Sequence, residues 1–174
     1  MGVSLAISTA SPSPLLHQQP IFSEPRNYLL PGTPFAEPVM DLLVNIDVDD
    51  LSKAIAFYQE AAGLRLGRRF GSLGVEMLGA SSAIYLLAKP DGTRPSINTE
   101  EVRRYRRHWT PVHLDFVVPE LEAAVRGAIE AGATIEGEIQ THNWGRIAHM
   151  ADPFGHGICF IEFRGRGYDE IAIE

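Results

Sequence analysis

An internal repeat constrains the fold of this chain more than any other feature of its sequence. The stretch MDLLVNIDVDDLSKAIAFYQEAAG, which starts at Met40, is restated about seventy residues later as PVHLDFVVPELEAAVRGAIEAGA. In each copy an alternating apolar segment leads into an acidic turn, a leucine (Leu51 or Leu121) and a helical pattern that a glycine ends. Two copies of one supersecondary unit can enclose a cleft that neither forms alone. Residues at matching positions of the two copies are therefore the first candidates for a functional site.

Composition narrows the class of protein. With 174 residues, of which 45% are hydrophobic and 21% charged, the chain is long enough for one globular domain with a core. A net charge of −7 argues against a general nucleic-acid binder, because phosphate affinity needs an excess of Lys and Arg. The single cysteine, Cys159, excludes an internal disulfide framework and fits a reducing compartment. No apolar run approaches the roughly 18 residues of a membrane span. We expect a cytoplasmic protein that faces small molecules, with no nucleic-acid or membrane partner.

The first 39 residues differ from the rest. They hold seven of the twelve prolines and show no apolar periodicity, which is typical of an extended or disordered segment. As a signal peptide this segment is poor, since VSLAIS is short and no Lys or Arg precedes it. Met40 as the biological start remains an alternative. We expect a folded domain over residues 40–170, with module one at 41–88, a connector at 89–109 and module two at 110–165.

Local patterns predict the same order of elements in both modules. Module one reads as a strand over residues 42–48, a helix over 51–62 begun by the N-cap candidates Asp49 and Asp50, and three further strands. Module two reads as a strand from His113, a helix over about 120–131 and again three strands, with a well-defined turn at residues 152–155. The predicted strand ranges are 64–70, 74–78, 83–88, 133–138, 146–151 and 158–163. The predicted fold is α+β, with two tandem βαβββ modules that form an open, cleft-enclosing mixed sheet with the helices on its outer face.

The connector contains the segment TEEVRRYRRHW. We interpret it as a short solvated helix, with glutamates near its start and arginines near its end as the helix dipole prefers. The alternative is an anion-binding patch made by the four arginines.

The paired pattern resembles the vicinal oxygen chelate superfamily. The likeness lies in the helix residues Ala54, Phe57 and Tyr58, in the histidine that opens module two, and in the motif DPFGHGICFIEF. That superfamily includes glyoxalase I, bleomycin-resistance proteins, fosfomycin-resistance enzymes and extradiol dioxygenases. The resemblance covers residues 41–165 and implies the fold, whereas the function stays open because this scaffold hosts many chemistries.

The resemblance also implies where a metal would be held. Members with a metal place ligands at four equivalent positions, which here fall on Leu43, Tyr85, His113 and Cys159. Leucine cannot coordinate, and His113 with the Cys159 thiolate falls short of the three protein ligands that a catalytic divalent ion usually needs. We therefore expect a degenerate metal site, with His113 and Cys159 as its candidate ligands for Zn, Fe, Mn or Ni.

Strand alternation adds polar residues to the same cleft. Residues i and i+2 share a face, so Asn45 and Asp47 join the side of Leu43, and Asp115 joins that of His113. With Tyr85, Trp144 and Cys159 these residues could bind a polar ligand without any metal. His113 as a hydrogen-bonded barrel histidine, and Cys159 as a small apolar filler or as a nucleophile, remain alternatives.

The segment after Trp144 offers either Arg146 or His149 to the cleft, because the two differ in strand parity. If Ala151 pairs with His156, Arg146 lies on the cleft side and could bind a carboxylate or enolate oxygen, while His149 lies against the helix. A change of one residue in turn length reverses this assignment. We expect His156, in the turn itself, to face water.

Two functional hypotheses follow. In the first, the cleft between the modules binds a small organic molecule without chemistry. In the second, the protein is an atypical metal-dependent lyase or dioxygenase acting on a vicinal-dioxygen substrate, with the catalytic residue His113 as ligand or acid/base. We also expect a homodimer, in which the modules pair within one chain or are exchanged between chains.

Overall fold

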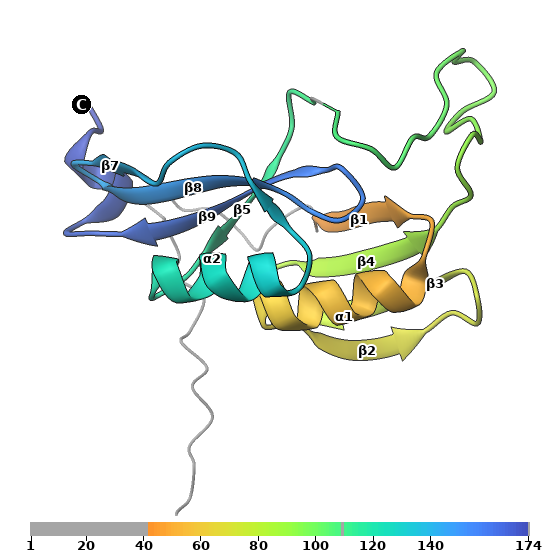
Figure 1. Ribbon diagram of the computed structural model, residues 1–174, viewed down its shortest axis with the longest axis horizontal. Helices are drawn as coiled ribbons and strands as arrows, with labels where there is room; N and C mark the ends of the chain where they lie inside the picture. Colours follow the sequence, from red (N-terminus) through yellow and green to blue (C-terminus); the bar gives the residue numbers. More distant parts are fainter. Residues whose placement is uncertain (1–41, 109, 174) are drawn as a thin grey trace, which may run out of the picture. The chain divides into compact units, whose positions relative to one another are not determined.

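The first module forms a four-stranded sheet with one helix. The computed structural model describes residues 42–108 and 110–173, so the expected proline-rich segment over residues 1–39 lies outside the described part. Module one consists of β1 (Leu43–Val48), α1 (Leu51–Ala62), β2 (Arg65–Arg69), β3 (Gly74–Leu78) and β4 (Ala83–Ala88). Its strand order is β1-β4-β3-β2, in which β1 runs parallel to β4 and the other pairs are antiparallel (Figure 1).

The second module repeats this plan with one irregularity. It consists of β5 (Leu114–Val117), α2 (Leu121–Glu130), β6 (Thr134–Ile135), β7 (Gln140–His142), β8 (Gly145–Ala151) and β9 (Gly157–Phe163), followed by a short 3-10 helix at Gly167–Glu170. Its sheet has the order β5-β9-β8-β6, and β7 also pairs with β8. The strand expected over residues 133–138 is thus shorter, as β6. It is followed by β7, which pairs with the same strand, β8, and Gly137 lies between them at φ 100°.

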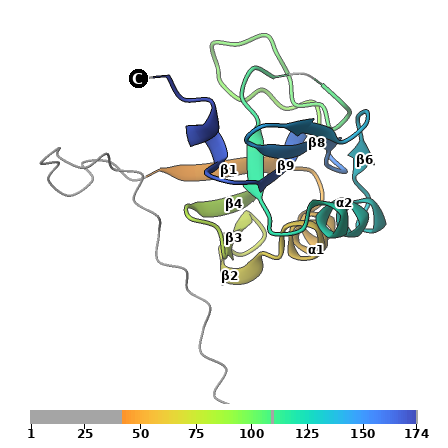
Figure 2. The same ribbon diagram turned by 90° about the vertical axis from the view of Figure 1, so that its left-hand side faces the viewer.

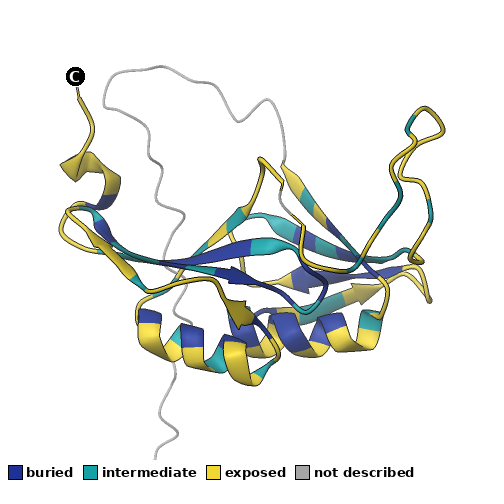
Figure 3. Ribbon diagram, turned by 45° about the horizontal axis from the view of Figure 1, so that its top comes forward, coloured by how far each residue is buried: buried dark blue, intermediate teal, exposed yellow. Residues whose placement is uncertain are grey.

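Both helices cover the same side of the two sheets and lie side by side (Figure 2). Buried residues of α1 and α2 face the sheets, and the outer surfaces of both helices are exposed (Figure 3). Alternate strand residues such as Ile46, Leu86 and Phe160 are buried against the helices, which leaves the other set on the opposite face. The α+β fold of two helix-covered βαβββ modules is confirmed, and it is built from two mixed sheets.

The local signals for α1 are those that the sequence predicts. Asp50 caps its N-terminus by accepting the backbone N–H of Lys53 at 2.9 Å, and Gly63 ends it in the left-handed conformation. The helix bounds agree with the predicted 51–62. No described helix has the length and apolarity that crossing a membrane would require.

The predicted helix in the connector is wrong, because residues 99–108 have no helical structure. Arg103 instead reaches Asp47 of β1 at 2.7 Å, and Arg107 reaches Glu136 of module two at 2.8 Å. An extended backbone lets the connector arginines contact both modules, whereas a helix would place residues four apart on one face. These ion pairs occupy two of the arginines that the anion-patch alternative would need.

Candidate functional site

The helix-free face of module two gathers ionisable side chains from three neighbouring strands. Asp115 of β5 lies beside Cys159 of β9, and Cys159 lies beside His149 of β8. His113 precedes β5 and shares the parity of Asp115. These positions alternate with Leu114 and Ile158, which pack toward the helices.

Three of these groups are close enough to act together. The Nε2 atom of His113 lies 3.2 Å from Oδ1 of Asp115, and ligand atoms of His113, Asp115 and Cys159 all lie within 4.8 Å of one another. Cys159 is buried, and burial raises the pKa of its thiol to about 12, with a further contribution from the Asp115 charge. The thiol therefore carries its proton at neutral pH unless a cation displaces it.

The register of the β8–β9 hairpin decides which residue of β8 shares this face. Ala151 pairs with Gly157 and His149 with Cys159, one residue away from the expected pairing of Ala151 with His156. Of the two registers that the sequence left open, the structure has the one that puts His149 on the Cys159 face, so the placement of Arg146 in the cleft is wrong. Arg146 lies on the helix side, where it forms ion pairs with Glu122 of α2 and with Glu162. A role for Arg146 in the cleft does not follow from this geometry.

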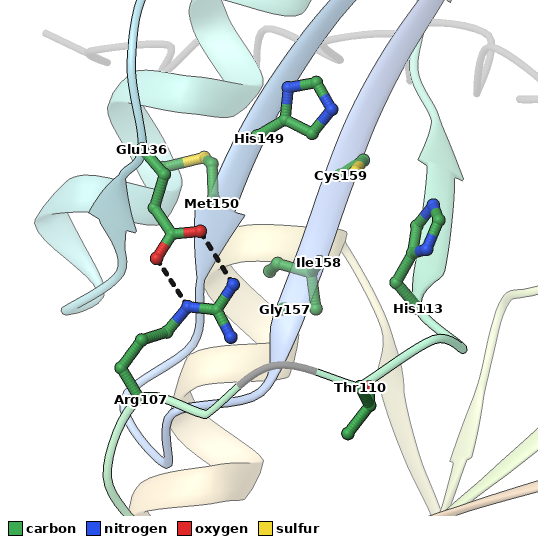
Figure 4. A pocket seen from close by; sticks show the side chains of 9 residues that line it. All are labelled: Arg107, Thr110, His113, Glu136, His149, Met150, Gly157, Ile158 and Cys159. Atoms are coloured by element: carbon green, nitrogen blue, oxygen red, sulfur yellow. Dashed lines mark hydrogen bonds and ion pairs between the residues drawn. The ribbon is translucent and has the colours of Figure 1, made fainter.

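A cavity of about 250 Å³ opens beside Cys159 (Figure 4). The ion pair between Arg107 and Glu136 forms one side, and His113 stands on the other. Bidentate contact with Arg107 holds the pKa of the Glu136 carboxyl below its usual range. No local sequence pattern predicts the pairing of Arg107 with Glu136, since it spans 29 residues between the connector and the segment that follows β6.

The matching face of module one has a different character. Leu43 is exposed and offers no donor atom, and the Tyr85 hydroxyl lies 3.3 Å from both the Arg68 guanidinium and the Glu76 carboxylate. Glu76 is buried and accepts two hydrogen bonds from the Arg68 guanidinium, at 2.6 and 2.9 Å. Arg68, Glu76 and Tyr85 thus satisfy one another.

A larger cavity, of about 600 Å³, lies between β1 of module one and the start of β5 in module two. We call it the junction pocket. Its polar lining includes Asn45, Asp47 and His113, and Asp47 is held there by Arg103. The remaining wall is mainly apolar, with side chains of Leu42, Val44, Ile46, Val112, Leu114 and Ile158. Two further histidines, His108 and His156, line it, and neither was among the predicted site residues.

Trp144 belongs to an aromatic cluster at the far end of module two. Its ring stacks on His142 at 5.0 Å and contacts Tyr168 at 5.1 Å between ring centroids. Neither Trp144 nor Tyr85 lines the 250 Å³ cavity or the junction pocket.

Comparison with known proteins agrees with this architecture. A family model described as a glyoxalase-like domain matches residues 43–161. The anthracycline biosynthesis protein DauV of a Streptomyces species is 30% identical over 126 residues, which are 70% of this chain and 40% of that protein. The similar protein DnrV of Streptomyces peucetius is 34% identical over 84 residues, 47% of this chain. Our chain thus spans 29% and 40% of the length of these two relatives.

Solved structures share the fold at low sequence identity. A glyoxalase/bleomycin resistance protein/dioxygenase family enzyme from Burkholderia phytofirmans has a TM-score of 0.54 at 20% identity, covering 70% of this chain and 97% of that one. The fosfomycin resistance protein FosX from Listeria monocytogenes has the same TM-score at 15% identity, covering 75% and 96%.

Proposed function

The chain belongs to the glyoxalase-like domain family, and from this premise we propose that it binds a small organic molecule in the junction pocket between its two modules. The observation that supports this most is the pocket itself, with a volume of about 600 Å³ and walls from both modules. Small-molecule sites are mostly apolar cavities of roughly 300–1,000 Å³ with a few convergent polar groups. The lining by β1 and β5 aliphatic side chains, with Asn45 and His113 among them, fits this description.

We expect the ligand of the junction pocket to be aromatic. The pocket walls are aliphatic, and imidazole rings offer edges and faces for stacking against a planar molecule. The names of DauV and DnrV point in the same direction, because they refer to the biosynthesis of anthracyclines.

A neutral naphthalene probe tests the pocket. We expect 1-methoxy-4-nitronaphthalene to bind in calorimetry and to raise the melting temperature of the protein. The variant Asn45→Trp places a large ring in the pocket and should weaken binding at least tenfold, an effect of about 1.4 kcal/mol. The matched control Ser72→Trp adds the same ring to the exposed turn between β2 and β3 and should bind like the unaltered protein. No binding, or equal binding by Asn45→Trp, would contradict the proposal.

A second candidate function is metal-dependent chemistry, which the cluster of His113, Asp115 and Cys159 favours. One nitrogen, one oxygen and one sulfur donor make three protein ligands, the number that catalytic zinc sites use. A thiolate donor favours Zn or Fe over Mn. All three donors come from module two, so the site would not need a ligand from Leu43 or Tyr85. A divalent ion bound there would act as a Lewis acid toward a ligand oxygen.

Cobalt binding tests the metal proposal by spectroscopy. We expect Co²⁺ to produce a thiolate-to-metal absorption band that Cys159→Ala abolishes and His113→Gln weakens. Binding should strengthen as pH rises, since the thiol must lose its proton. Tyr85→Phe, on the face of module one, is the matched control and should leave the band unchanged. A band that survives Cys159→Ala would place the ion elsewhere.

A further inference from the structure

A buried carboxylate joins the two modules at one edge of the junction pocket. The side chain of Asp152, in the turn between β8 and β9, is fully buried and accepts four hydrogen bonds. Its Oδ1 atom accepts the backbone N–H groups of Phe154 and His156 at 2.9 and 2.8 Å. Its Oδ2 atom accepts the Tyr58 hydroxyl of α1 and contacts Nδ1 of His156, each at 2.8 Å. The expectation that His156 faces water is therefore wrong, since its side chain is only 25% exposed.

These contacts fix the proton on the His156 ring. Tyr58 is buried, and burial raises the pKa of its hydroxyl well above the usual value, with a further increase from Asp152. Tyr58 thus stays a donor, and the carboxylate only accepts. In the neutral imidazole Nδ1 consequently carries the proton, and Nε2 keeps its lone pair.

His156 is also one of the residues that line the junction pocket. The connector closes over it because Gly155, at φ 87°, lets the main chain of Arg106 pass where a side chain would collide. His108 then donates its backbone N–H to the Gly155 carbonyl at 3.3 Å, and its ring meets that of His156 edge to face at 5.6 Å. Three titratable side chains contact His156 directly: Asp152, His108 and Tyr105, whose ring centroid lies 6.4 Å from that of His156. Tyr58 is linked to it through Asp152.

We propose that His156, positioned by Asp152, is the proton acceptor of the junction pocket and that the pocket selects aromatic molecules with an acidic hydroxyl group, such as phenols. This inference rests on the proposed binding of a small molecule in that pocket. It assigns a role to a histidine outside the cluster of His113, Asp115 and Cys159.

The chemistry is a single proton transfer. The O–H bond of the bound phenol breaks, its electron pair stays on the oxygen, and the proton forms a bond to Nε2 of His156. The resulting imidazolium keeps its Nδ1–H bond to the Asp152 carboxylate, which stabilises the positive charge and holds the ring in place. Tyr58 and the two turn amides fix the carboxylate, so little rearrangement accompanies the transfer.

The test compares 4-nitro-1-naphthol with its methyl ether, 1-methoxy-4-nitronaphthalene, on the full chain. At a pH where the free naphthol is mostly protonated, we expect the bound naphthol to show the absorption band of its anion. It should also bind at least tenfold more tightly than the ether. His156→Gln should lose both the band and the preference, and circular dichroism shows whether the variant is folded. The comparison on the unaltered protein needs no variant and stands even if His156→Gln does not fold.

The outcomes separate this inference from the proposed function. Equal binding of both compounds without the anion band would overturn the role of His156 and leave the pocket in place. A band that persists in a folded His156→Gln protein would assign the proton acceptor elsewhere and overturn the inference as well. Failure of both compounds to bind would overturn the pocket and the inference together.

Discussion

The two modules share one topology but use their helix-free faces differently. In module one, Arg68, Glu76 and Tyr85 bond to one another, so these three polar groups of that face are satisfied among themselves. In module two, His113 and Asp115 remain partly exposed beside the Cys159 thiol. A duplicated scaffold can thus keep one face for stability and the other for ligands, because the strand pattern fixes only which positions point to each face.

The two helices also differ, in the size of the side chains that they place at matching positions. Leu51 and Leu121 occupy the same repeat position, so Phe57 and Tyr58 of α1 correspond to Gly127 and Ala128 of α2. Both α1 aromatics are fully buried, and Tyr58 reaches Asp152 of the other module. The two helices lie close together at Gly127, where an added Cβ would be in ordinary van der Waals contact with the Glu60 carbonyl oxygen at 3.8 Å. Helix α1 therefore contributes more to holding the modules together.

Removal of the α1 core aromatic should have the largest effect. We expect Phe57→Ala to lower the free energy of unfolding by about 3–5 kcal/mol, because it deletes a buried ring and leaves a cavity. Urea denaturation measures the change. Ile129→Ala on α2, where the side chain is 46% exposed, is the control and should change stability by no more than about 0.5 kcal/mol. A loss for Phe57→Ala no larger than that for Ile129→Ala would show that the buried Phe57 ring contributes little to stability.

The thiol of module two should be unreactive. With a pKa near 12 and only 3% of the residue exposed, we expect Cys159 to react with iodoacetamide at pH 8 at least about a hundredfold more slowly than free cysteine. Mass spectrometry of the native protein over time gives the rate, and the same reaction in urea is the control. Rapid native alkylation would mean that the cluster holds a thiolate.

Loss of the hydrogen bond from Tyr58 to Asp152, which links the modules, should destabilise the protein less than loss of the Phe57 ring. Tyr58→Phe removes a hydrogen bond to a buried carboxylate, and we expect a loss of about 1.5–3 kcal/mol in the free energy of unfolding. The denaturation midpoint should fall with an unchanged slope. A change in the slope would instead indicate that the modules unfold separately.

The ion pair between Arg68 and Glu76 in module one should make the stability of the protein depend on pH. Hydrogen bonds from Arg68 lower the pKa of Glu76 to about 2, so the pair stabilises the folded state above pH 4.5, and this stability is lost as pH falls from 4.5 toward 2. Thermal melts of Glu76→Gln should show a lower melting temperature at pH 7 and a shallower decline on acidification. A parallel decline in both proteins would show that Glu76 contributes nothing to acid sensitivity.

Much of the fold could be predicted because its signals are local. The bounds of α1 follow from Asp50, the apolar spacing and Gly63, and the repeat extended the same plan to α2. Strand alternation also predicted that His113 and Asp115 share a face, and the family resemblance placed Cys159 with them, which agrees with the pairing of Asp115 and Cys159 in the sheet. The prediction of a helix in the connector was wrong because Arg103 and Arg107 are held by partners that are 56 and 29 residues away in sequence.

The sequence by itself determined the duplicated βαβββ plan, the start and end of α1, and the set of residues that alternate to each face of a strand. Tertiary structure alone decided which set of β8 residues shares the face of Cys159, because a shift of one residue in the hairpin register exchanges Arg146 for His149. It also decided that Tyr58, Asp152 and His156 meet. Tyr58 and Asp152 are 94 residues apart, and no local pattern encodes a hydrogen bond that forms only when the two modules pack together.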